Sequence, residues 1–192
     1  MTWKNDQVSE LETAEIIRLA HEALGIEGDF VEMGCYKGDT SLLLAEVVKN
    51  TPHRLWIYDS FEGLPKKTNS DYSEIGKDFQ AGELLVTKRE VKERFLKAGL
   101  KVPMIKKAWF SELEDADLPE KIAFAFLDGD FYESIKDSLR LVEKKFLPGG
   151  IVLVHDYTNE ALPGVVKAVD EWNSDKKYLI KKFESLAIIR IK

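Results

Sequence analysis

Residues 122–134 read IAFAFLDGDFYES, a run of six apolar residues that ends in two aspartates around one glycine. A carboxylate that is buried without a partner is costly, so the run predicts a buried strand that ends at a polar edge. Asp130 is placed to cap a helix that begins near Phe131 or Tyr132. Asp128 has no such local use, which makes it the candidate functional residue of this stretch.

Apolar runs and helical stretches alternate on both sides of this strand. Further strands are predicted at 29–34, 53–59, 102–107, 151–157, 178–184 and 185–192. Helices are predicted at 9–24, 38–50, 83–99, 132–146 and 164–175, and PGG at 148–150 is expected to end the fourth of them. Ser9 and Glu12 have the spacing of a capping box at the start of the first helix.

This alternation predicts an α/β fold with a doubly wound, mostly parallel sheet of seven strands. The closing pair of strands predicts an antiparallel strand at the C-terminal edge of that sheet. No linker divides the chain, so we expect one domain over residues 1–192, with a helical N-terminal segment at 1–27. The polar stretch at 64–82 lacks a sustained period and is expected to be a functional loop or a lid.

Composition argues against several classes of protein. The chain has a formal charge of −6, which disfavours a nucleic-acid partner. Its single cysteine cannot form an intramolecular disulfide. The polar N-terminus lacks the core of a secretory signal, and no apolar run approaches the roughly 20 residues of a membrane span. We therefore expect a cytoplasmic protein without a membrane partner, and leave open whether it forms a homo-oligomer.

Several polar side chains lie at the ends of the apolar runs. Ligands of doubly wound sheets bind beyond the carboxyl ends of the strands, so these residues are expected along one rim. They are Glu32, Asp59, Asp128, His155 and Asp156.

The first predicted strand is followed by a turn with Gly34 and Gly38. Such a turn lets a ligand approach the backbone at a helix start, but taken alone it is more often a structural turn. Asp59, at the end of the next strand, could accept hydrogen bonds from ribose hydroxyls or could cap a turn. Together the two features favour a nucleoside-containing cofactor.

Two carboxylates and an imidazole, from Asp128, Asp156 and His155, could converge from neighbouring strands. Mg²⁺ prefers oxygen ligands, whereas a histidine ligand suits Mn²⁺, Fe²⁺ or Zn²⁺ better. The alternative is that His155 and Asp156 hydrogen-bond only to the loop backbone. Trp109 and Phe110 could stack on an adenine or fill the core.

Five motifs carry a resemblance to a known family. They are FVEMGCYKGDTS (30–41), YDSFEGLP (58–65), KKAWF (106–110), FLDGDFYESIKDSL (126–139) and LPGGIVLVHDY (147–157). In this order, over roughly residues 28–172, the chain resembles the macrocin O-methyltransferases (TylF/MycF type). These are class I enzymes that use S-adenosylmethionine to methylate hydroxyls on natural-product sugars.

The resemblance implies a Rossmann-like class I methyltransferase that methylates a hydroxyl on a small molecule. It implies a metal site for Mg²⁺ or Mn²⁺ at Asp128, His155 and Asp156, with Asp128 or His155 as the general base. The cofactor-binding residues that it implies are Glu32, Gly34, Cys35, Tyr36, Gly38, Thr40, Asp59, Ser60, Phe61, Trp109, Phe110 and Asp128.

The chain departs from the family's pattern at two points. His155 stands where the family has the first residue of an Asp-Asp pair, which leaves the presence and identity of a cation open. The chain is also shorter, so the family's sugar pocket and natural-product substrate are not assumed for it. Two alternatives remain: a non-catalytic protein that binds an adenosyl ligand, and an NAD-dependent oxidoreductase of similar architecture. GCYKG departs from the dinucleotide fingerprint and disfavours the second.

Overall fold

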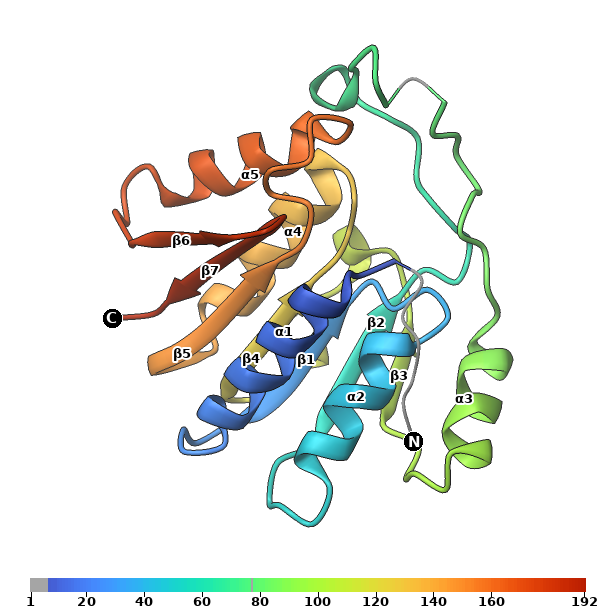
Figure 1. The fold of residues 1–192 in the computed structure, drawn as a ribbon, viewed down its shortest axis with the longest axis vertical. Helices are drawn as coiled ribbons and strands as arrows, with labels where there is room; N and C mark the ends of the chain where they lie inside the picture. The colour runs from blue at the N-terminus through green and yellow to red at the C-terminus, as the bar shows by residue number, and fades with distance from the viewer. Residues whose placement is uncertain (1–6, 77) are drawn as a thin grey trace.

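The computed structural model describes residues 7–76 and 78–192, and in it helices flank a central sheet (Figure 1). The first six residues of the predicted N-terminal segment lie outside the described residues. The helices are α1 (Glu10–Ala23), α2 (Asp39–Val48), α3 (Lys88–Lys97), α4 (Tyr132–Glu143) and α5 (Pro163–Asn173). The strands are β1 (Asp29–Met33), β2 (Leu55–Asp59), β3 (Met104–Lys107), β4 (Ile122–Leu127), β5 (Phe146–Val154), β6 (Ile180–Phe183) and β7 (Leu186–Arg190).

The seven strands form one sheet in the order β3-β2-β1-β4-β5-β7-β6. Strands β1 to β5 run parallel, whereas β7 is antiparallel to both β5 and β6. The predicted α/β fold with an antiparallel strand at its C-terminal side is therefore confirmed. Because the chain leaves β1 in one direction and returns to β4 beside it, the order reverses at this pair. Ligand clefts of open parallel sheets form at such a reversal.

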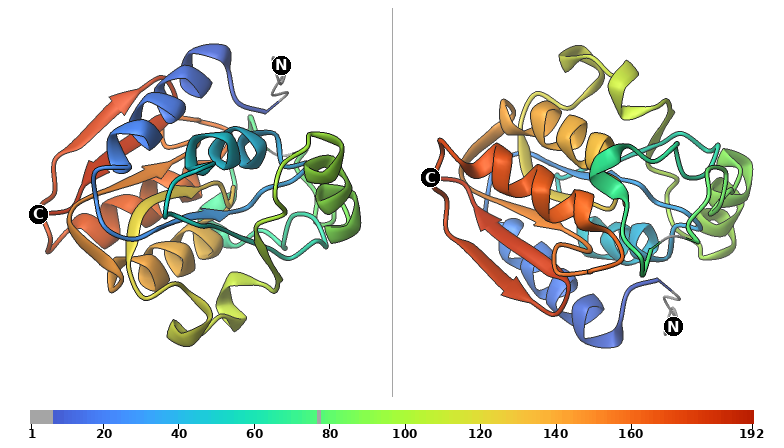
Figure 2. Two further views of the ribbon diagram at one scale, coloured as in Figure 1. Left: turned by 90° about the horizontal axis from the view of Figure 1, so that it is seen from below. Right: turned by 90° about the horizontal axis from the view of Figure 1, so that it is seen from above.

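Helices cover both faces of the sheet. Helices α1, α2 and α3 pack on one face, and α4 and α5 pack on the other (Figure 2). The side chains of β4 alternate between the two layers: Phe124 and Phe126 join the α1 and α2 layer, whereas Ala125 and Leu127 join the α4 and α5 layer. All six residues of β4 are buried, as the apolar run predicts for a central strand.

Both edge strands carry a lysine pair. Lys106 and Lys107 lie on β3, where they form ion pairs with Asp117 and Glu62. Lys181 and Lys182 are exposed on β6, at the opposite edge of the sheet. Among the described residues, no helix has the length and apolar character needed to cross a membrane.

Capping residues fix the first turns of helices α1 and α3. The predicted capping box of Ser9 and Glu12 is present at α1. The predicted start of α3 at residue 83 is wrong, because the helix begins after Thr87, whose hydroxyl accepts a hydrogen bond from the Glu90 N–H. Thr87 and Glu90 form a second capping box, which fixes the first turn of α3 there.

The segment Pro148–Gly150 does not end α4, which is a correction to the prediction. Helix α4 ends at Glu143, and PGG lies inside β5. The register between β4 and β5 shifts in this region, between Ile122 and Phe124 of β4. Proline is tolerated in a strand at such an irregularity, because the ladder there is already interrupted.

Residues 64–82 contain one short 3-10 turn, Asn69–Asp71, and no longer helix or strand among the described residues. Asp71 is fully buried and accepts a hydrogen bond from the Tyr132 N–H at 2.6 Å, so it caps α4. The prediction that Asp130 caps this helix is therefore wrong. Gly164 leaves the room that Asp71 needs, because a Cβ there would lie 2.0 Å from the Asp71 Oδ1.

Candidate active site

A cavity of about 260 Å³ opens at the carboxyl ends of the central strands. Its wall combines the turn after β1, the ends of β2, β4 and β5, and Phe79, Glu83 and Leu84 from the segment between β2 and α3. The predicted site residues that line it are Gly34, Tyr36, Asp59, Ser60, Trp109, Phe110, Asp128, His155 and Asp156.

The other predicted cofactor residues do not line this cavity. Cys35, Thr40 and Phe61 are buried, and burial raises the pKa of the Cys35 thiol well above its ordinary value. This thiol is therefore a packing group and not a nucleophile. Gly38, with a φ of 83°, begins α2.

Gly34 brings the ends of β1 and β4 together. Its φ is 87°, in the left-handed region, and a Cβ at this position would lie 1.9 Å from the carbonyl oxygen of Asp128. Any side chain would therefore collide with the backbone of the neighbouring strand. The glycine in the predicted turn is required by this close approach.

Asp59 fastens the same turn to β2. One carboxylate oxygen accepts hydrogen bonds from the N–H groups of Cys35 and Tyr36, at 2.8 and 3.3 Å. The other oxygen accepts a hydrogen bond from the Phe61 N–H at 2.7 Å. The carboxylate of Asp59, which is predicted to bind a ribose, therefore also positions the turn.

Glu32 lies beneath the turn and outside the cavity. Its side chain is buried and accepts a hydrogen bond from the hydroxyl of Ser41 on α2. Burial raises the pKa of Glu32 to about 8, although the Ser41 hydrogen bond favours the ionised form. Glu32 therefore links β1 to α2, and the protein holds it in the protonated form at neutral pH.

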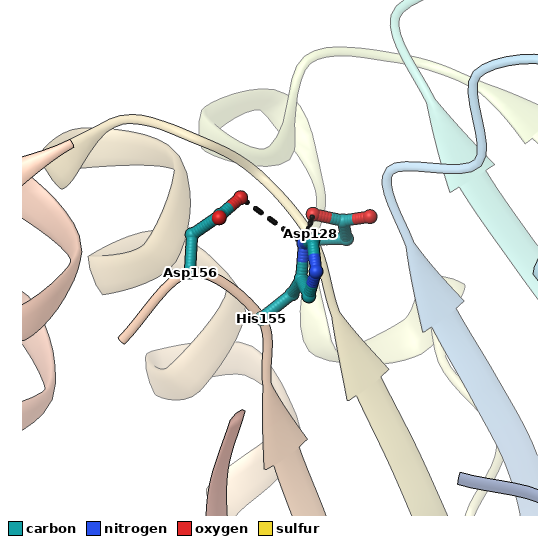
Figure 3. A group of neighbouring side chains, drawn as sticks. All are labelled: Asp128, His155 and Asp156. Atoms are coloured by element: carbon teal, nitrogen blue, oxygen red, sulfur yellow. Dashed lines mark hydrogen bonds and ion pairs between the residues drawn. The ribbon is translucent and has the colours of Figure 1, made fainter. Parts of the chain in front are cut away.

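The three residues predicted to bind a metal ion come together at the ends of β4 and β5. Figure 3 shows His155 between the two carboxylates, with its Nδ1 3.0 Å from both the Asp128 Oδ1 and the Asp156 Oδ2. One ligand atom from each residue lies within 4.8 Å of the others, which suits ligation of a single ion. His155 is buried, whereas Asp128 and Asp156 are partly open to the cavity.

The surroundings of His155 are strongly acidic. Burial opposes its charged form, but Asp128, Asp156 and Glu12 outweigh that effect and raise the pKa of the imidazole well above its ordinary value. The Nε2 atom lies 3.9 Å from the Glu12 Oε2. Without another cation, the ring carries a positive charge that balances part of this cluster.

Three functional candidates escaped the sequence prediction. Asn159 donates a hydrogen bond to the Asp156 Oδ1 at 2.9 Å and so orients it. Asp130, with a φ of 60°, lines the cavity, and its carboxylate has no hydrogen bond or ion pair within the described residues. Glu12 belongs to α1, and only its capping motif was visible in the sequence. No spacing rule connects these side chains to the cluster.

Comparisons with known proteins place this geometry in context. The family model described as macrocin-O-methyltransferase (TylF) matches residues 9–186. The 8-demethyl-8-(2,3-dimethoxy-alpha-L-rhamnosyl)-tetracenomycin-C 4'-O-methyltransferase of Streptomyces olivaceus is 31% identical over 146 residues, which are 71% of this chain and 56% of that protein. The mycinamicin III 3''-O-methyltransferase of Micromonospora griseorubida is 27% identical over 158 residues, 77% of this chain and 61% of the relative. The chain thus spans about three fifths of the length of these relatives.

Solved structures agree on the fold. The O-methyltransferase NovP superimposes with a TM-score of 0.77 and 25% identity, over 94% of this chain and 79% of NovP. An O-methyltransferase from Bacillus cereus in complex with SAH has a TM-score of 0.69 at 11% identity, over 99% of this chain and 84% of the other, and supports the fold alone. Because the family model covers almost the whole chain, the protein belongs to the macrocin O-methyltransferase (TylF) family.

Proposed function

We propose that this protein transfers a methyl group from S-adenosylmethionine to a hydroxyl of a small molecule that resembles a sugar or a natural product. The observation that carries the proposal is the cavity, in which the turn at Gly34 meets the cluster of Asp128, His155 and Asp156. Membership of the TylF family and the named relatives support the same activity.

The cofactor would lie over the ends of β1 and β2. Gly34 leaves the backbone accessible there, and Asp59 is the carboxylate that would face the ribose. Trp109 and Phe110 are half-buried in the cavity wall, where their rings would contact the adenine. S-adenosylmethionine supplies an activated methyl group, so the main task of these residues is alignment, which can lower a barrier by up to several kcal/mol.

The acceptor would lie over the ends of β4 and β5. Its hydroxyl oxygen forms a bond to the methyl carbon while the bond from that carbon to sulfur breaks, and the electrons of that bond stay on the sulfur. Asp128 takes the hydroxyl proton, since its carboxylate lines the cavity. The positive charge that the acidic cluster gives the His155 ring leaves it no free nitrogen to accept this proton, which favours Asp128 over His155 as the base.

Asp128, His155 and Asp156 would hold a divalent cation, Mg²⁺ or Mn²⁺. The donor set fits, because two carboxylates and one ring nitrogen converge on one point at the cavity wall. Such a cation would make the acceptor hydroxyl more acidic. The chain itself supplies the ligands and keeps Asp156 in place through Asn159.

The loop at 64–82 would close over the bound molecules. Its first part is docked on α4 and α5 through Asp71, and its second part contributes Phe79 to the cavity wall. Movement of the second part alone would exclude water while the anchored part stays in place.

Calorimetric titration with S-adenosylmethionine, S-adenosylhomocysteine and NADH tests the cofactor. We expect the two adenosyl compounds to bind and NADH not to bind; binding of NADH alone would sink the proposal. Formation of S-adenosylhomocysteine should then be measured against a panel of deoxysugar-bearing and phenolic acceptors, with and without Mg²⁺.

A non-catalytic adenosyl-binding protein is the second candidate. The position of His155 favours it, because the charged ring occupies the centre of the acidic cluster. Tight binding of S-adenosylmethionine with no turnover of any acceptor, at any Mg²⁺ or Mn²⁺ concentration, would support this candidate over the methyltransferase.

A further inference from the structure

Glu12 connects three parts of the molecule. It lies in α1 and is 5% exposed. Its Oε1 accepts hydrogen bonds from the N–H and hydroxyl of Ser185, at 2.9 and 2.6 Å, in the turn between β6 and β7. Its Oε2 accepts hydrogen bonds from Ser9 and lies 3.9 Å from the His155 Nε2.

The capping box explains only part of this arrangement. Ser9 and Glu12 satisfy the first turn of α1, and Thr87 and Glu90 do the same for α3. Glu90 performs that role while exposed to solvent. Capping therefore requires neither the burial of Glu12 nor its position behind the ring of His155.

The ring of His155 has two nitrogens with different surroundings. Its Nδ1 faces Asp128 and Asp156, and its Nε2 faces Glu12. A cation bound at Nδ1 needs the lone pair of that atom, so the ring proton must then be on Nε2. A carboxylate beside Nε2 stabilises this tautomer and fixes the plane of the ring.

We propose that Glu12 is a positioning residue of the cation site. It keeps the ring proton of His155 on Nε2, so that Nδ1 can bind a divalent cation together with Asp128 and Asp156. The inference rests on the cation of the proposed function, but not on methyl transfer. Helix α1 is then a component of the site as well as a cover of the sheet.

Mn²⁺ binding to the full, cofactor-free chain tests the inference. Free Mn²⁺ is measured by electron paramagnetic resonance for the wild type and for E12Q. Glutamine is accepted at this position of a capping box, so α1 should stay capped. We expect Mn²⁺ to bind E12Q about 10- to 100-fold more weakly than the wild type.

Two control variants separate the charge near His155 from other effects. E22Q removes a carboxylate from the same helix, where Glu22 pairs with Arg190 and Arg18 near the surface. S9A removes the capping hydroxyl but keeps Glu12. E22Q should bind Mn²⁺ like the wild type, and S9A, which loses one hydrogen bond to the Glu12 Oε2, should lose less affinity than E12Q. A loss in S9A as large as that in E12Q would assign the effect to helix capping and overturn the inference.

Nitrogen-15 NMR of histidine side chains gives a readout that does not depend on stability. The chain has three histidines, so the ring of His155 can be assigned by comparison with H155N. At a Mg²⁺ concentration that just saturates the wild type, the wild type should show a proton on Nε2 alone, and E12Q, only part of which binds the cation, should show a mixture of protonation states. The same tautomer and the same Mn²⁺ affinity in E12Q would overturn the inference.

A further variant covers failure of E12Q to fold. E12D keeps the charge but shortens the side chain, and it should also bind Mn²⁺ more weakly. Wild-type affinity in folded E12D would then count against Glu12. If the wild type itself binds no Mn²⁺, the proposed cation is wrong, and the inference about Glu12 is wrong with it. Methyl transfer is still tested separately, by cofactor binding and turnover.

Discussion

Glu32 is a carboxyl group whose ionisation is opposed by its surroundings. Burial raises its pKa to about 8, against 4.5 for an ordinary glutamate. Between these values the folded chain keeps a proton that the unfolded chain has lost. The contribution of Glu32 to the free energy of unfolding should therefore fall as pH rises from about 4.5 to 8, by at most about 1.4 kcal/mol per pH unit.

The variant E32Q should lack this pH dependence, because an amide does not titrate. Urea unfolding at pH 5 and pH 8 measures the effect: the stability of E32Q relative to the wild type should be greater at pH 8. E46Q, which alters an exposed glutamate of α2, is the control. Equal slopes for E32Q and the wild type would show that Glu32 does not hold this proton.

Replacement of Gly34 by alanine should destabilise the protein by at least about 2 kcal/mol, since the Cβ would meet the Asp128 carbonyl oxygen and the backbone conformation is strained. Gly82 has the same φ of 87° and has no atom within 4 Å of the corresponding Cβ position. G82A therefore reports the strain alone. If G34A and G82A lose equal stability in urea, the close approach to β4 is not important.

Asp128 and Asp130 can be compared directly as proton acceptors. We expect D128N to lower kcat about 10²- to 10⁴-fold with an acceptor identified in the turnover assay, because the base is lost. D130N should have a smaller effect, and D115N, at an exposed aspartate, none. The reverse order of D128N and D130N would move the base to Asp130.

At the residue scale, prediction succeeded where a side chain follows a strand. Asp128, His155 and Asp156 converge because parallel neighbours end at one edge, and the sequence shows where each strand ends. Glu12 and Asp71 could not be predicted in their observed roles. Their contacts join segments that are distant in the sequence, and neither the spacing nor the residue type reveals such a contact.

Among the elements, the long loop is anchored on α4 by the side chain of Asp71. Asp71 accepts hydrogen bonds from the Tyr132 N–H of α4 and from Thr68 of its own turn. D71A should destabilise the protein by about 1–2 kcal/mol, as other losses of a helix cap do. It should also make residues 64–86 more sensitive to proteolysis.

Limited proteolysis and urea unfolding of D71A measure both effects. S70A is the control, because it removes only the exposed contact between the Ser70 hydroxyl and Lys167. Resistance of the loop in D71A equal to that in S70A would show that Asp71 does not anchor it.

The boundaries of elements were predicted less well than their order. Apolar periodicity located every helix and strand, since burial of a face requires it. Thr87 decides the start of α3. In the sequence, several polar residues upstream compete with it as candidates for the capping position. PGG resembles a helix stop, and only the irregular register between β4 and β5 places it in a strand.

At the scale of the whole molecule, the proposed cation site joins the ends of β4 and β5, and Glu12 of α1 lies beside it. An ion that binds only the folded protein should stabilise the entire chain. At 100 times its dissociation constant, Mn²⁺ should add about 2.7 kcal/mol to the free energy of unfolding. D156A should gain little, and EDTA should reverse the gain in the wild type. Equal gains in both proteins would place the ion elsewhere.

The global topology was within reach of the sequence because alternating strands and helices allow few arrangements. The sequence did not predict the position of β7 between β5 and β6, because a terminal pair of strands can join the sheet through either member. The choice is consistent with burial: β7 has four buried apolar residues, whereas the two lysines of β6 are exposed.

The lysine pairs of the two edge strands have a consequence for the behaviour of the protein in crowded solution. An unpaired edge strand is a template on which another chain can add a strand and begin an aggregate. Two molecules that meet along β6 would bring Lys181 and Lys182 of both chains close together, and the repulsion would oppose pairing. On β3 the ion pairs with Asp117 and Glu62 reduce this repulsion. A homo-oligomer of this chain should therefore not form by pairing one β6 with another.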